Sequence, residues 1–153
     1  KTNDKSVSFP RVSPNGNMLM FTLADYGNFS IWHKEADLYM VNLDNDSIMP
    51  LSALNSNDVE SYHSWSSNGR WVVFSSRRDN GLYTQPFIAY IDIDGTPHKP
   101  FILPQKEKSY YNSLMKSFNV PEFISGEVKT NQYTLSRKAK DDKGIDVTFG
   151  GFR

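Results

Sequence analysis

Apolar and polar positions alternate through most of the first hundred residues, in short runs separated by polar turns. One apolar run, 18–23, directly follows the turn sequence SPNG at 13–16, and another, 71–76, follows SSNG at 66–69. Asn-Gly between two strand-like runs predicts a tight reversal, because glycine adopts the left-handed backbone angles of such turns without strain. We therefore expect Gly16 and Gly69 to have positive φ. The second phrase repeats the first 53 positions later.

The repeat continues beyond each turn. Runs at 37–46 and 87–95 alternate like strands and end in acidic turns, and Pro-bounded segments follow at 47–54 and 98–104. With the entering strands at 8–13 and 62–66, each unit has four predicted strands. Four short antiparallel strands repeated about every 50 residues are typical of propeller blades, while a β-sandwich with two similar hairpins is the alternative. We predict an all-β fold with about two four-stranded antiparallel propeller blades.

These patterns predict four segments: a first blade at 1–54, a second at 55–104, a closing segment at 105–128 and a polar tail or start of another module at 129–153. Apolar residues between 110 and 118 have helical spacing, which predicts one short helix that Pro121 ends. We expect 122–128 to form a closing strand and the charged stretch after Lys129 to be a linker. The run 145–152 is either a final strand or part of another module.

Alternation within the strands also predicts the core. The expected buried residues are Leu19, Phe21, Tyr39, Val41, Trp65, Val72, Phe74, Ile91 and Ile93, with Met18, Met20 and Val73 buried as well if both faces of a blade are covered.

Composition narrows the function classes. The 153 residues include 17 basic and 17 acidic side chains and no cysteine. The balanced charge argues against nucleic-acid binding, and the lack of cysteine excludes disulfides and thiolate chemistry. No apolar run has the roughly 20 residues of a transmembrane helix.

The predicted number of blades is small. A propeller needs about four to eight blades. Three explanations stay open: the chain is the C-terminal part of a longer propeller, several copies close a ring, or two blades stand alone and pair through their edges. We expect further blades, from the same parent chain or from other copies, to cover the exposed edges and faces.

The phrases FPRVSPNGNMLMFTL, YHSWSSNGRWVVFSSRR and FIAYIDIDG resemble the TolB-type, WD40-like β-propeller repeat. That family has Pro-Asp-Gly where this chain has Pro14-Asn15-Gly16 and Ser67-Asn68-Gly69. The resemblance covers about residues 9–103, and the later sequence is similar to the end of envelope propellers from Bacteroidetes. It implies a propeller fold and a periplasmic or envelope-associated location, and it is specific for fold rather than for function.

The sequence predicts no catalytic residue, metal site or cofactor. It has no Gly-x-Ser-x-Gly, no His-Glu-x-x-His and no phosphate-binding glycine loop. The three histidines, His33, His63 and His98, are isolated from one another, and the acidic sequences at 44–47 and 92–95 are typical of turns.

Long loops of a rigid β scaffold commonly carry binding residues. The long connections 24–37, 55–63 and 77–86 are predicted to lie at one end of the blades. Their candidate partner-binding residues are Trp32, His33, Tyr62, Arg77, Arg78 and Tyr83. Two alternatives stay open: Phe29 and Trp32 cover the blade rim as a small core, or the arginines only pair with Asp25, Asp79 or Glu60.

Two functions follow as expectations. The first is a non-enzymatic envelope platform that binds a protein, peptide or glycan partner through its long loops. The alternative, which the resemblance implies, is an accessory or gating propeller of a larger hydrolase or peptidase, with the catalytic domain outside this chain.

Overall fold

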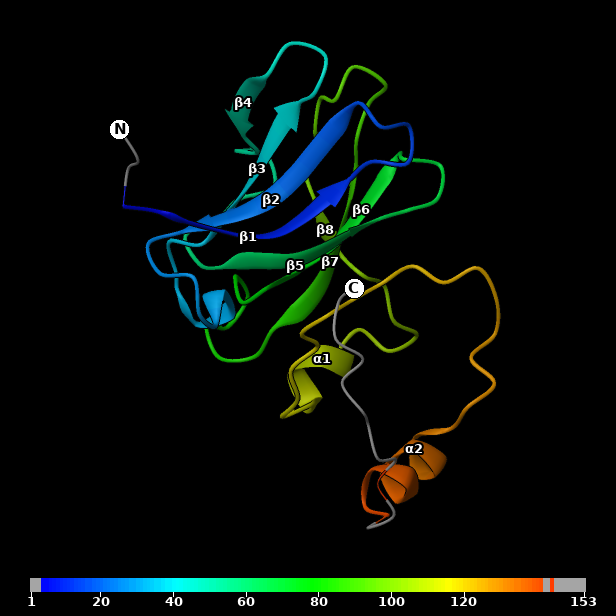
Figure 1. Ribbon diagram of the computed structural model, residues 1–153. Helices are drawn as coiled ribbons and strands as arrows, with labels where there is room; N and C mark the ends of the chain where they lie inside the picture. The colour runs from blue at the N-terminus through cyan, green and yellow to red at the C-terminus, as the bar shows by residue number, and fades with distance from the viewer. Residues whose placement is uncertain (1–3, 142–143, 145–153) are drawn as a thin grey trace. The chain divides into compact units, whose positions relative to one another are not determined.

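The computed structural model describes residues 4–141 and 144. The first sheet has the order β1 (Ser6–Val12), β2 (Met18–Ala24), β3 (Asp37–Asn42), β4 (Ser47–Pro50), and the second has β5 (Glu60–Trp65), β6 (Trp71–Ser76), β7 (Gln85–Tyr90), β8 (Phe101–Ile102). All neighbouring strands are antiparallel, and Figure 1 shows each sheet as a simple up-and-down meander. This confirms the predicted fold of two propeller blades.

The repeated turns form through the same local contacts in both sheets. In the first, Ser13 Oγ donates to Asn15 Oδ1 at 2.6 Å and accepts from Met18 N at 3.0 Å. In the second, Ser66 Oγ donates to Asn68 Oδ1 at 2.7 Å and accepts from Trp71 N at 3.0 Å. The glycines that close these turns have φ of 81° and 66°, as predicted for positions 16 and 69. Short polar side chains thus stabilise each reversal before any distant contact forms.

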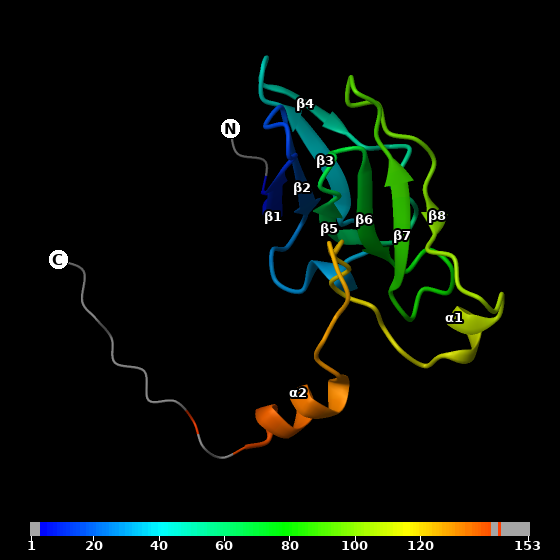
Figure 2. The same ribbon diagram turned by 90° about the vertical axis from the view of Figure 1, so that its right-hand side faces the viewer.

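The main core lies between the two sheets, which Figure 2 shows side by side. The first sheet contributes Met18, Met20, Leu38 and Met40, and the second contributes Val72, Phe74, Phe87, Ala89 and Ile91. Leu51 and Leu54, from the connection between the sheets, complete this core. At roughly 1.5–3 kcal/mol for each fully buried large apolar side chain, this layer is the main source of stability.

The predicted core is confirmed in part: Phe21, Val72, Phe74 and Ile91 are buried, as are Met18, Met20 and Val73, while the other predicted residues are not. Leu19, Tyr39 and Val41 are partly exposed, because they lie on the face of the first sheet that points away from the second. Both faces of this sheet are apolar, so alternation alone does not identify the inner one. Trp65 is also only partly buried. Ile93 is 86% exposed, since β7 ends at Tyr90 and a turn follows.

The segment after β8 differs from the prediction. The helix α1 (Tyr110–Ser113) is a single turn, and residues 122–128 have no strand. The backbone of Phe118 instead donates to Thr84 O at 2.9 Å, and Ser75 Oγ lies 2.7 Å from Phe118 O. None of the residues of α1 is buried, so little tertiary packing supports a longer helix there.

The chain divides into two compact units, 1–123 and 124–153. In the second unit, α2 (Gln132–Ala139) occupies part of the stretch predicted to be a linker. Asn131 caps it by accepting a hydrogen bond from Thr134 N at 2.9 Å, and Arg137 and Lys138 lie in its last turn, where the helix dipole favours cations. The run 145–152 lies outside the described residues. Within those residues, the helices are too short or too polar to cross a bilayer.

Candidate functional site

The long connections 25–36, 51–59 and 77–84 meet at one end of the sheets, which we call the loop end. A buried carboxylate lies at its base. Glu60 is 0% exposed, and its oxygens accept from Ser56 N at 2.8 Å, Ser56 Oγ at 2.7 Å and Ser76 Oγ at 2.7 Å. Arg78 Nη2 lies 2.9 Å from the same carboxylate. The charge is therefore paired and well solvated by protein groups, as a buried carboxylate requires.

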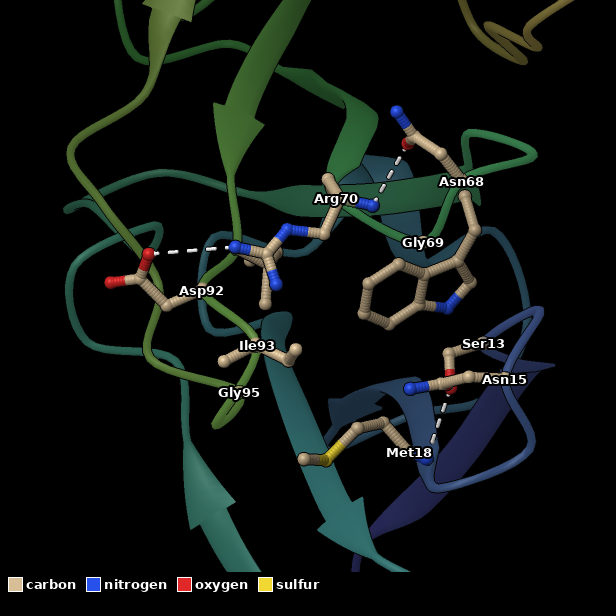
Figure 3. Close-up of a pocket in the computed structure, with 11 residues that line it drawn as sticks. Ser13, Asn15, Met18, Asn68, Gly69, Arg70, Asp92, Ile93 and Gly95 are labelled. Atoms are coloured by element: carbon tan, nitrogen blue, oxygen red, sulfur yellow. Dashed lines mark hydrogen bonds and ion pairs between the residues drawn. The ribbon is translucent and has the colours of Figure 1, made fainter.

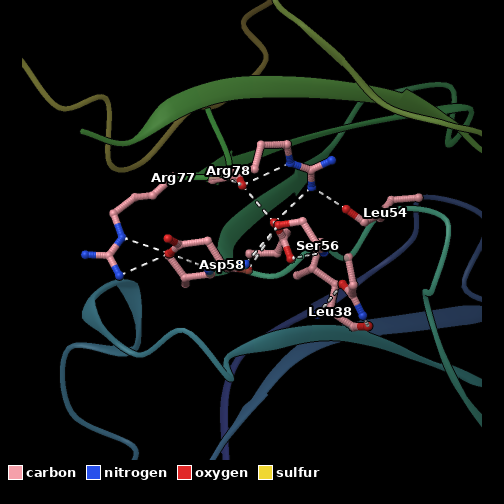
Figure 4. Close-up of polar contacts among 10 residues, drawn as sticks. Leu38, Leu54, Ser56, Asp58, Arg77 and Arg78 are labelled. Atoms are coloured by element: carbon pink, nitrogen blue, oxygen red, sulfur yellow. Dashed lines mark hydrogen bonds and ion pairs between the residues drawn. The ribbon is translucent and has the colours of Figure 1, made fainter. Parts of the chain in front are cut away.

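A second ion pair lies beside the first. Arg77 Nη2 and Nε lie 3.1 Å and 3.2 Å from Asp58 Oδ1, and the side chains are only 7% and 11% exposed (Figure 4). Asp58 Oδ1 also accepts from Val59 N at 2.8 Å. Together, the two pairs join the connection between the sheets to the end of β6. We expect them to stabilise the loop end.

The first loop presents aromatic rings to solvent above these ion pairs. The 3₁₀ helix η1 (Ser30–Trp32) buries Ile31, while Trp32 is 63% exposed and Phe29 is 76% exposed. Ile31 packs with Ala24, Ala36 and Val59 in a second small core. The rim is therefore covered by Ile31, rather than by Phe29 and Trp32 as one alternative proposed.

Trp32 is nevertheless held in place. The Arg77 guanidinium lies 5.4 Å from the centroid of its ring, and Arg77 Nη2 donates to Trp32 O at 3.4 Å. Phe29, directly before η1, has φ of 52°, which is uncommon for a residue with a Cβ atom. The exposed rings thus project from a loop whose backbone is fixed from below by the Arg77–Asp58 pair.

The other candidate residues lie apart from this contact. His33 is partly exposed, with Nδ1 3.5 Å from Glu35 and Nε2 3.2 Å from Asn28 O. Tyr62 lies within β5 and packs against Phe9 at 4.7 Å, and Tyr83 is partly exposed. Asp25, the predicted acidic neighbour of the arginines, pairs with Lys5 instead. Of the six candidates, the structure brings Trp32 and Arg77 into direct contact.

Two titratable side chains near these elements have shifted pKa values. Burial, with the charges of Glu60 and Glu35, raises the pKa of Asp37 to about 6. Burial lowers the pKa of His63 to about 4, since its ring is 2% exposed and interacts through Nε2 with Met20 O at 3.0 Å. The sequence did not reveal either shift, because each depends on residues from other strands.

At the opposite end, a cavity of about 240 Å³ lies between the two Asn-Gly turns (Figure 3). Arg70 lines it from the second sheet, with Nη2 3.7 Å from Asp92 Oδ1 and 2.5 Å from the Tyr90 hydroxyl. Gly95 packs against Met18, and a methyl group added there would lie 2.6 Å from Met18 Cε. This close approach joins the turn after β7 to the first sheet.

The fold and these ends define a two-blade part of a β-propeller. In the described part of the chain, no three His, Asp or Glu side chains are grouped to hold a metal ion. No family model matches the sequence, and no curated protein matches it significantly.

Among solved structures, the chain is similar to the β-propeller domain of the Trilobed protease from Pyrococcus furiosus. The sequences are 16% identical, the TM-score is 0.43, and the match covers 65% of this chain and 30% of that one. The match thus spans less than a third of the length of that chain.

Proposed function

We propose that the chain is part of a non-enzymatic β-propeller platform that binds a protein, peptide or glycan partner through the loop end. The observation that carries this proposal is the position of Trp32. Its side chain is 63% exposed, yet it rests on Arg77, which the Asp58 carboxylate anchors at 3.1 Å. An aromatic side chain that is already ordered loses little conformational entropy on binding, and Trp is enriched at binding hot spots.

Neighbouring side chains extend this surface. Tyr26 is 58% exposed and contacts the His33 ring at 5.9 Å, and Leu82 from the second long loop is 66% exposed. Aromatic rings of this kind suit sugar faces and apolar side chains. In this proposal Arg77 and Arg78 support the surface from beneath.

We also propose that the parent protein is a TolB-like propeller of the bacterial envelope, of the kind found in Bacteroidetes, and that it acts in the periplasm. The support is the resemblance of the two turn-and-strand phrases, each with Ser-x-Asn-Gly before an apolar strand.

The test is a selection of ligands with the immobilised chain, from a random peptide library on phage and from a glycan array. The enriched peptide or glycan is then titrated against variants. We expect Trp32→Ala to weaken binding by about thirtyfold, which corresponds to a hot-spot loss of about 2 kcal/mol. Trp32→Phe should retain part of the affinity.

The matched control is Ile93→Ala, because Ile93 is 86% exposed and follows β7 at the opposite end of the sheet. The proposal would be contradicted if the selected ligands bound the Trp32→Ala variant as tightly as the wild type. It would also be contradicted if only the Ile93→Ala substitution weakened their binding. The failure of both libraries to yield any ligand would contradict it as well.

A further inference from the structure

A small polar cavity lies at the loop end, beside the ion pairs of Arg77 and Arg78. Its volume is about 320 Å³, and it is lined by Ser56, Asn57, Asp58 and Arg78. The first three residues belong to the connection between the two sheets, and Arg78 follows β6. The lining of the cavity is therefore complete within these two blades and needs no residue from another blade.

Several polar groups of this cavity have no partner within the protein. Asp58 receives all its side-chain hydrogen bonds on Oδ1, and in the described part of the chain Oδ2 accepts none. The Asn57 side chain is exposed and makes no hydrogen bond to the other described residues. Arg78 uses Nε and Nη2 for contacts within the protein, which leaves Nη1 available. One cavity thus holds a carboxylate acceptor, an amide and a guanidinium donor that a ligand can satisfy.

The charges around the cavity cancel, which favours a neutral ligand. Arg78 is paired with Glu60 at 2.9 Å, and Arg77 is paired with Asp58 at 3.1 Å. Glu60 is fully buried. An anionic ligand that drew Arg78 away would leave this carboxylate buried without its partner, and that loss is costly. A neutral hydroxyl group leaves both ion pairs in place, and it both donates and accepts at a single atom.

An aromatic surface lies next to the polar cavity. Asp58 lines the cavity and also anchors Arg77, whose guanidinium carbon lies 5.4 Å from the centroid of the exposed Trp32 ring. Figure 4 shows Arg77 on one side of Asp58 and Ser56 on the other, so the ring and the cavity flank the same carboxylate. A sugar suits both, because its ring has an apolar face of C–H groups and its edge carries hydroxyls. An apolar peptide side chain would find a partner in Trp32 but none in the cavity, whose lining residues are all polar.

We infer that the loop end binds a neutral oligosaccharide, with one sugar ring stacked on Trp32 and the hydroxyls of a neighbouring sugar in the cavity between Ser56 and Arg78. Asp58 Oδ2 accepts from one hydroxyl, while Arg78 Nη1 and the Asn57 amide donate to others. This inference rests on the binding role proposed for the loop end, and it selects the glycan among the ligand classes considered there.

The test is a glycan array that carries neutral oligosaccharides such as maltotetraose, cellotetraose and mannotetraose beside anionic ones such as tetragalacturonate. The strongest neutral binder is then titrated against variants by isothermal titration calorimetry. We expect Asn57→Ala to weaken binding about fivefold or more, as the loss of one hydrogen bond does. Trp32→Ala should weaken it about thirtyfold. Because the Asn57 side chain makes no hydrogen bond within the described protein, its variant should retain the circular dichroism spectrum and thermal midpoint of the wild type.

Asn17→Ala is the matched control and should leave the affinity unchanged. Asn17 is also exposed, makes its hydrogen bonds through the backbone and lies in the turn between β1 and β2, at the opposite end of the first sheet. An array on which only anionic glycans bind, or none, would overturn the inference, and so would a neutral ligand that Asn57→Ala binds as tightly as the wild type. If peptides from the phage library then bind in a Trp32-dependent manner, the platform function stands without a sugar ligand. If neither peptide nor glycan binds, both proposals fail.

Discussion

Replacement of Glu60 by alanine tests whether the loop end is held by its buried charges. The carboxylate has no solvent exposure and four hydrogen-bond contacts at 2.7–2.9 Å, including the one from Arg78. Its removal leaves the Arg78 guanidinium, whose side chain is 19% exposed, without its anionic partner. Breaking a buried pair in this way costs about 3–5 kcal/mol. That is a large part of a total stability of about 5–15 kcal/mol.

Urea unfolding followed by circular dichroism measures this loss through the transition midpoint at constant m-value. Glu60→Gln, which keeps the shape and part of the hydrogen bonding, should cost less. Glu35→Ala removes a carboxylate that is 39% exposed in a neighbouring loop and serves as the control. In a double-mutant cycle, Glu60→Ala and Arg78→Ala should be non-additive by more than about 1 kcal/mol. A loss below about 1 kcal/mol for Glu60→Ala would refute the reasoning.

Two further predictions concern stability. The folded pKa of His63, about 4, lies below its unfolded value of 6.5, so the unfolded chain binds the proton more tightly. Stability should therefore fall by about 3 kcal/mol as the pH drops from about 6.5 to about 4. The raised pKa of Asp37 makes stability change with pH in the opposite direction, so the effect of His63 is measured as a difference between two proteins. The free energy of unfolding of the wild type and of His63→Gln is determined by urea titration at several pH values across this range. The same change of stability with pH in both proteins would contradict the prediction. Gly95→Ala should lower the midpoint of thermal unfolding by more than Gly16→Ala does. Both glycines have positive φ, so alanine brings about 1 kcal/mol of backbone strain at either position. Only the methyl group added at position 95 also meets the side chain of Met18. Equal losses would show that the contact with Met18 relaxes freely.

Local sequence predicted the strands and turns because the forces that form them act over a few residues. The Ser13 hydroxyl accepts from the backbone only five positions later, and the second turn repeats that contact. The seven-residue strand β2 and the six-residue strand β6 start at the residues that the apolar runs indicated, Met18 and Trp71. The length of the helix predicted at 110–118 was overestimated, because a distant contact decides the structure there. The apolar spacing is a local pattern, but the backbone N–H of Phe118 donates to Thr84 O, which is far away in the sequence.

By itself, the sequence determined the repeat, the order of the strands and the class of fold, since alternation and turn residues act locally. The tertiary structure decided which face of the first sheet is inside: both faces are apolar, and only the position of the second sheet distinguishes Met20 from Phe21. It also decided the role of the loop-end arginines. Arg77 meets Asp58 across 19 residues and Trp32 across 45, and such pairings depend on how the chain folds back, which no spacing in the sequence records.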